Sequence, residues 1–108
     1  MGDGLHLMPR HRRAVQELLD VHLPGVEVWV YGSRVSGRSH DASDLDLVLR
    51  APGLRPIPMR ELAAFTEALR DSNIPFLVDT HDWARLPEVF QREIGREHVV
   101  LVEGRAEG

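Results

Sequence analysis

Hydrophobic residues recur along this chain at two spacings, one typical of helices and the other of strands. Beginning at Pro9, apolar side chains fall on one helical face until Pro24 interrupts the pattern. The same spacing returns after Pro58, and again from Pro87 to about His98. We therefore predict three amphipathic helices, whose apolar faces comprise Val15, Leu18, Leu19 and Leu23, then Met59, Leu62, Phe65 and Leu69, then Val89, Phe90 and Ile94.

Three further segments carry the pattern of strands, because they are rich in β-branched and aromatic residues or alternate between apolar and polar positions. They cover residues 26–31, 44–49 and 74–80, and the apolar tail 99–102 would add a short last strand. Along the chain the main elements follow in the order α-β-β-α-β-α. This order predicts an α/β (α+β) fold in which a small mixed sheet is backed by helices.

The length and composition are those of an ordinary globular domain. The chain has 108 residues, of which 43% are hydrophobic and 28% are charged. A chain of this length corresponds to one domain, so we expect residues 1–108 to fold as a single unit. We expect the two ends, residues 1–8 and 103–108, to be frayed.

The residue types that are missing exclude several kinds of chemistry. All 13 residues counted as lysine or arginine are arginine, and cysteine is absent. A phosphate-binding lysine, a thiol nucleophile and cysteine-ligated zinc are therefore excluded. The net charge of −4 argues against broad binding to nucleic acid or to an anionic membrane. No apolar run reaches the roughly 18 residues of a membrane span, and no signal peptide is recognisable, so we expect a cytoplasmic protein.

Two aspartates open the second predicted strand. Residues two apart on a strand point to the same face, so Asp44 and Asp46 would project side by side while the intervening leucines face the helices. Two carboxylates about 4 Å apart repel by about 4 kcal/mol at an effective dielectric of 20, and a cation would relieve this repulsion. Their hard oxygen ligands favour Mg²⁺ or Mn²⁺ over zinc. The alternative is a pair of solvated aspartates at a strand start.

The turn after the first predicted strand has the residues of an anion site. If a short helix starts at Ser33, its free N–H groups and its hydroxyl would bind an anion, and Gly32 would let a phosphate approach the backbone closely. The alternative is a plain capping serine in a surface turn.

Together these two motifs resemble a known family. Residues 32–38 (Gly-Ser-Arg-Val-Ser-Gly-Arg) and 43–47 (Ser-Asp-Leu-Asp-Leu) are similar to the signature of the DNA polymerase β-type nucleotidyltransferase superfamily, and in particular of its minimal nucleotidyltransferases. The resemblance covers nearly the whole chain. It implies a polymerase β-like fold in which Gly32 and Ser33 hold the triphosphate of the substrate ATP. Val35 and Ser36 depart from the family pattern, which usually has a small residue and then an arginine at these places.

The resemblance also implies the catalytic and metal-binding residues. Asp44 and Asp46 would bind two Mg²⁺ ions, with Mn²⁺ as the alternative, and a third carboxylate on a neighbouring strand would complete the site. Asp79 is the candidate for this carboxylate and for the general base. Its alternative role is a cap before Trp83. Arg34 and Arg38 would offset charge on the phosphates, or else lie in the loop as solvated cations.

Three functions follow from these expectations. Free-standing minimal nucleotidyltransferases are typically antitoxins encoded beside a helical HEPN ribonuclease toxin, so the resemblance implies transfer of AMP from ATP to a toxin hydroxyl, expected to be a tyrosine. The alternative from another class is a binding module that neutralises its partner by masking it, without catalysis. A third candidate is transfer of a nucleotide to a small molecule or to RNA. Direct binding to nucleic acid is not expected at this net charge.

Overall fold

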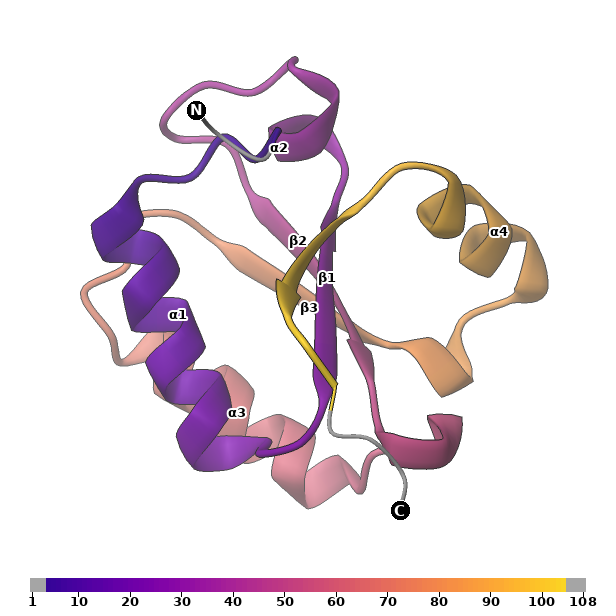
Figure 1. Ribbon diagram of the computed structural model, residues 1–108. Coiled ribbons are helices and arrows are strands. Elements are labelled where there is room, and N and C mark those ends of the chain that lie inside the picture. The colour runs from indigo at the N-terminus through magenta and orange to yellow at the C-terminus, as the bar shows by residue number, and fades with distance from the viewer. Residues whose placement is uncertain (1–3, 105–108) are drawn as a thin grey trace.

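The computed structural model of the chain describes residues 4–104, in which helices surround a four-stranded sheet (Figure 1). The strands are β1 (Glu27–Tyr31), β2 (Leu45–Arg50), β3 (Val78–Asp82) and β4 (Val99–Val102). The helices are α1 (Pro9–His22), α2 (Ser33–Ser36), α3 (Met59–Arg70) and α4 (Glu88–Arg96), with two 3-10 turns, η1 (Pro52–Leu54) and η2 (Trp83–Arg85). Within residues 4–104, no helix combines the length and the apolarity that crossing a membrane requires.

The sheet is mixed, as predicted. Its strand order is β3-β2-β1-β4, with β1 antiparallel to both β2 and β4, and β2 parallel to β3. A parallel pair needs a long crossover connection, and α3 supplies it between β2 and β3. The short last strand expected in the apolar tail is β4, which pairs along the outer edge of β1. The α/β fold with helices backing a small mixed sheet is therefore confirmed.

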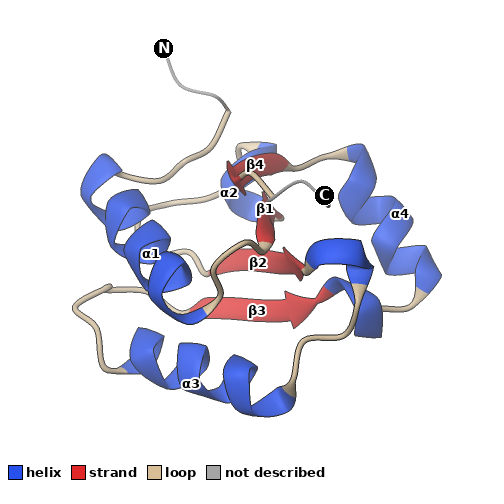
Figure 2. Cartoon of the chain, turned by 60° about the horizontal axis from the view of Figure 1, so that its bottom comes forward, coloured by secondary structure: helices blue, strands red, loops and turns tan. Residues whose placement is uncertain are grey.

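One face of the sheet carries the main core. The alternate side chains of β2, which are Leu45, Leu47 and Leu49, are fully buried beneath α1 and α3 (Figure 2). Phe65 of α3 is likewise fully buried in this core. The prediction that the leucines face the helices is thus confirmed, and the alternation of β2 turns Asp46 to the opposite face.

Helix α4 covers part of that opposite face, which the sequence pattern leaves open. Ile94 of α4 and Val48 of β2 are both buried there. Arg50 lies over the rings of Trp29 and Trp83, 4.0 and 4.7 Å from their centroids, and pairs with Glu27 at 2.7 Å. This cation–π cluster closes the half of the face that is remote from the aspartates.

The third strand lies further along the chain than its pattern predicts. It covers Val78–Asp82, whereas residues 74–80 were expected. Pro75 has no N–H group to donate to a strand ladder, and pairing with β2 begins only where Leu45 donates its N–H to the carbonyl of Leu77 at 2.9 Å. The strand prediction was therefore wrong for residues 74–77, and it stopped two residues too early.

The described part of the N-terminal segment differs from the frayed end that was expected. Leu5 and Leu7 pack against the core, and the His6 N–H donates to the carbonyl of Arg34 at 2.7 Å. The ring of His6 also contacts Ser39 at 2.5 Å and Asp41 at 3.2 Å. At the other end, residues 103 and 104 are exposed and follow β4 without regular structure. Residues 1–3 and 105–108 lie outside the described residues.

Candidate active site

The turn from β1 into α2 brings the backbone against a carboxylate. Gly32 has φ 85° and ψ −152°, a conformation that is essentially open only to glycine. A Cβ built on Gly32 would stand 2.5 Å from Oδ2 of Asp46, so glycine is required here both by its torsion angles and by this close approach. The turn leaves Ser33, half-buried, as the first residue of α2.

Three aspartates lie near one another at this end of the sheet. Asp46 and Asp79 are direct partners across the parallel β2–β3 pair, so their side chains share a face on strands about 4.8 Å apart. Asp44 is exposed one residue before β2 begins. Burial, followed by repulsion from Asp79 and Asp44, raises the pKa of Asp46 above its ordinary value, while His81 opposes the rise. The charges of the three carboxylates are therefore coupled.

The oxygen donors of these aspartates fit Mg²⁺, bound in a site that water and substrate phosphates would complete, and not a site enclosed by protein ligands alone. Among residues 4–104, no three His, Asp or Glu side chains converge closely enough to enclose an ion by themselves. Mg²⁺ is commonly held by one or two carboxylates, with water and substrate phosphates completing its octahedron. The exposed Asp44 and Asp79 and the crowded carboxylate of Asp46 are all oxygen donors, and a cation would relieve their repulsion.

Arg34 does not have the phosphate-facing role that was expected of it. The side chain is buried, and its guanidinium donates to the carbonyls of Ser43 (2.7 and 3.0 Å), His6 (2.7 Å) and Asp41 (3.0 Å). It also stacks over Phe76 at 4.3 Å. Because all three guanidinium nitrogens donate to these carbonyls, Arg34 ties the loop before Asp44 to the N-terminal segment.

The remaining residues of the turn behave differently from one another. Val35, which departs from the family pattern, packs against the hydrophobic core. The hydroxyl of Ser36 donates to the carbonyl of Ser33 at 3.4 Å. Arg38 is exposed in the loop after α2, where it remains a candidate for a phosphate contact.

The capping role considered for Asp79 belongs to Asp82. The carboxylate of Asp82 is buried and accepts from the N–H groups of Ile57 (2.8 Å) and Ala84 (3.2 Å) and from Arg85. Asp79 is exposed, and its carboxylate contacts the ring of His81 at 3.4 Å. The sequence did carry a signal for this role of Asp82, because the residue stands directly before Trp83, the first residue of η2.

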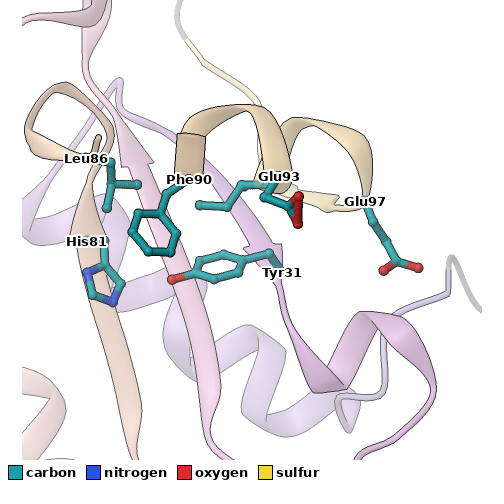
Figure 3. Close-up of a pocket in the computed structure, with 7 residues that line it drawn as sticks. Tyr31, His81, Leu86, Phe90, Glu93 and Glu97 are labelled. Carbon is teal, nitrogen blue, oxygen red and sulfur yellow. The ribbon is translucent and has the colours of Figure 1, made fainter. Parts of the chain in front are cut away.

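A cavity of about 420 Å³ opens beside the aspartates, between the sheet and α4 (Figure 3). Tyr31 and His81 project into it from the sheet, and Phe90 descends from α4. Burial, together with the charges of Asp46 and Asp79, raises the pKa of Tyr31 to about 12, so its phenol stays protonated at neutral pH. The spacing of residues along the sequence did not reveal this cavity.

Comparison with known families supplies the class of protein. Residues 15–107 match the family described as "Polymerase beta, Nucleotidyltransferase", and the chain belongs to this family. It is also 35% identical over 89 residues to the "Probable protein adenylyltransferase MntA" of Haemophilus influenzae (strain ATCC 51907 / DSM 11121 / KW20 / Rd), a match that covers 82% of this chain and 76% of that protein.

Solved structures of toxin–antitoxin pairs share the fold. A chain in the "Crystal structure of the toxin-antitoxin with AMP-PNP" superposes with a TM-score of 0.70 and 20% identity, covering 84% of this chain and 72% of the other. A chain in the structure of a mutant MntA toxin–antitoxin pair superposes with a TM-score of 0.69 and 17% identity over the same shares. At these identities the superpositions show a common fold.

Proposed function

We propose that this protein is a Mg²⁺-dependent adenylyltransferase that transfers AMP from ATP to a tyrosine hydroxyl of a HEPN-type ribonuclease toxin, and so acts as the antitoxin. The observation that carries the proposal is the apposition of Asp46 with Asp79 and with the Gly32 turn. The match to a probable protein adenylyltransferase supports transfer to a protein, and the shared fold with toxin–antitoxin structures supports the kind of partner. Since ATP is the donor, we place the reaction in the cytoplasm.

Each candidate residue other than Arg34 has a defined role in this proposal. Gly32 and Ser33 bind the triphosphate at the start of α2, and Arg38 is near enough in sequence to contact it. Asp44, Asp46 and Asp79 hold Mg²⁺, with two ions expected and Mn²⁺ as a substitute. When bound, the ions neutralise charge on the phosphates and lower the pKa of the attacking hydroxyl.

The transfer is a single in-line displacement at phosphorus. The phenolic oxygen of the acceptor forms a bond to the α-phosphorus, the bond from that phosphorus to the α–β bridging oxygen breaks, and pyrophosphate leaves. The phenolic proton passes to the carboxylate of Asp79, which is exposed on the reacting face. His81, 3.4 Å from this carboxylate, orients it.

The test is co-expression of the protein with the product of the neighbouring gene, followed by mass spectrometry of that product for added AMP. Asp44→Asn with Asp46→Asn should abolish the modification, whereas Asp71→Asn, at the far end of α3, should not. Neutralisation that survives the double substitution without added AMP would favour masking. Label from ATP that appears on a small molecule or on RNA instead would favour the third candidate.

A simpler measurement tests the nucleotide site by itself. ATP with Mg²⁺ should raise the melting temperature of the purified protein well beyond Mg²⁺ alone, because a ligand that binds only the folded state stabilises it. At 100 times the dissociation constant this linkage contributes about 2.7 kcal/mol. Absence of any shift at millimolar ATP would contradict the proposal.

A further inference from the structure

The cavity beneath α4 borders the carboxylates of Asp46 and Asp79, because Tyr31 and His81, which line it, are neighbours of these aspartates. Ser33 follows the carboxyl end of β1, where Gly32 abuts Asp46. His81 lies two residues beyond Asp79 on β3, away from that turn, and forms one wall of the cavity. Tyr31, the register partner of Asp46, forms another wall, so an attacking group in the cavity would lie next to a nucleotide held at the aspartates.

The lining of the cavity suits an aromatic side chain. Figure 3 shows the ring of Tyr31 extending toward His81, with Phe90 and Leu86 above it. A mostly apolar pocket with a few polar groups is typical of ligand sites, and about 420 Å³ lies within the usual range. Aromatic rings add favourable edge and offset contacts to the burial of apolar surface. A phenol would therefore find both apolar walls and neighbouring rings here.

The charges at the other end of the cavity are negative. Glu93 and Glu97 of the α4 segment line it at the end away from His81 (Figure 3). Arg96 is the one cation recorded close to them among the described residues, 3.5 Å from Glu93 and largely exposed. Carboxylates at this place repel the anionic ATP and attract arginine or lysine.

The surface beside the cavity has the character of a protein-binding site. Phe90 is 57% exposed and Val89 is 61% exposed, so an apolar edge continues outward from the cavity along α4. Aromatic anchors surrounded by charged residues are typical of interfaces with proteins. A nucleobase would leave this outer edge uncovered.

We propose that this cavity is the acceptor site, which receives a tyrosine side chain from a partner segment rich in arginine or lysine, with Phe90, Glu93 and Glu97 determining which tyrosine is modified. The inference rests on the proposed adenylyl transfer, and assigns to the helix α4 segment the selection of the acceptor. The triphosphate keeps its place at the Ser33 turn, as in the proposed function.

Two synthetic peptides test the inference, each with one central tyrosine flanked by either arginines or glutamates. In the absence of ATP, the arginine peptide should shift the NMR signals of the Phe90 and His81 side chains, and the glutamate peptide should not. With ATP and Mg²⁺, the arginine peptide should be adenylylated with a KM about tenfold lower than that of the glutamate peptide. Glu93→Arg with Glu97→Arg should reverse this order, and 0.5 M salt should weaken the preference.

A matched control separates a local effect from one of net charge. Glu61→Arg with Glu67→Arg introduces the same charges on α3, which covers the other face of the sheet, and should leave the order of the peptides unchanged. Phe90→Ala should raise the KM for the arginine peptide while ATP with Mg²⁺ still raises the melting temperature. The exposed Phe90 contributes little to the core, so this variant should fold.

Three results would overturn the inference. The first is that ATP and Mg²⁺ alone shift the NMR signals of Phe90 and that Phe90→Ala loses the ATP-dependent rise in melting temperature, which would assign the cavity to the nucleobase. The second is an equal KM for the two peptides. The third is that neither peptide shifts the NMR signals of Phe90 and His81. Failure of the proposed function looks different, because no AMP would then appear on the toxin with any variant. If only the assignment of the acceptor site is wrong, the toxin is still modified, and the KM for the toxin is the same for the α4 variants as for the unmodified protein.

Discussion

The two faces of the sheet are built from the same strands, yet one face is packed with apolar side chains and the other carries clustered carboxylates. Leu45, Leu47 and Leu49 of β2 are fully buried on one face, under two helices. On the other face the same strand presents Asp46, which is crowded by two further carboxylates. One face thus gains stability from apolar burial, whereas the other gathers like charges that repel one another.

This difference arises because successive side chains of a strand point to opposite faces of the sheet, so that alternate residues can pack in the core while those between them remain on the other face. The contrast is not complete, because Arg50 and Trp83 close over Trp29 the half of that face that is remote from the aspartates. The half next to the aspartates is left as the cavity under Phe90. The fold therefore places a packed cluster and an open candidate site side by side on one face of the sheet.

The largest expected effect separates two phenylalanines, one on each side of the sheet. Phe65→Ala should cost about 3–5 kcal/mol of stability, because it empties a fully buried position beneath the core face. Phe90→Ala, on α4, removes a ring that is 57% exposed and should cost well under 1 kcal/mol. Urea denaturation of both variants measures the difference, and equal losses would contradict the view that α4 covers the face only partly.

The next effect concerns Arg34, the buried arginine that holds the loop before Asp44. Arg34→Ala leaves the carbonyls of Ser43, His6 and Asp41 without their donor and should cost about 3 kcal/mol. Arg38→Ala, in the exposed loop nearby, should change stability by no more than about 0.5 kcal/mol. Thermal melts compare them, and a neutral Arg34→Ala would show that this clamp does not hold the loop.

A smaller loss is expected at the glycine that touches the aspartate. Gly32→Ala should cost about 2 kcal/mol and abolish AMP transfer, since the added Cβ is strained at φ 85° and displaces the carboxylate of Asp46. Gly37→Ala is the matched control, because Gly37 has a similar φ of 88° but nothing within 4 Å of an added Cβ. It should cost about 1 kcal/mol and preserve activity. Loss of activity in both variants would remove the argument from contact with Asp46.

The smallest effect has the opposite sign. Asp46→Asn should raise the melting temperature at about pH 7 by about 2 °C while it abolishes AMP transfer, because it removes one of three repelling charges that solvent partly screens. Burial and repulsion raise the folded-state pKa of Asp46, so the ionised group costs stability above that pKa and the cost disappears as the pH falls through it. The gain should therefore shrink on acidification toward the ordinary aspartate pKa. A melting temperature lower than that of the unmodified protein at neutral pH would show that Asp46 stabilises the fold.

Local pattern determined most of the architecture. The helical spacing predicted α1, α3 and α4, and the alternation around Leu47 predicted both β2 and which of its faces is buried, because these signals depend only on the repeat of each element. The motif at Gly32 and the pair Asp44 and Asp46 suggested a phosphate and metal site before any tertiary contact was known. The family match is in accord with that resemblance.

Only the tertiary structure decided which residues at that end are exposed at the candidate site and which make structural contacts within the protein. Arg34 and Arg38 are equivalent as sequence symbols, but the path of the N-terminal segment buries the first and leaves the second exposed. Asp79 and Asp82 lie on one short strand, but the register with β2 sets the first beside Asp46 and the second against the N–H of Ile57. The cavity beneath α4 depends on how a helix crosses a sheet, which is a long-range packing outcome that no spacing along the chain encodes.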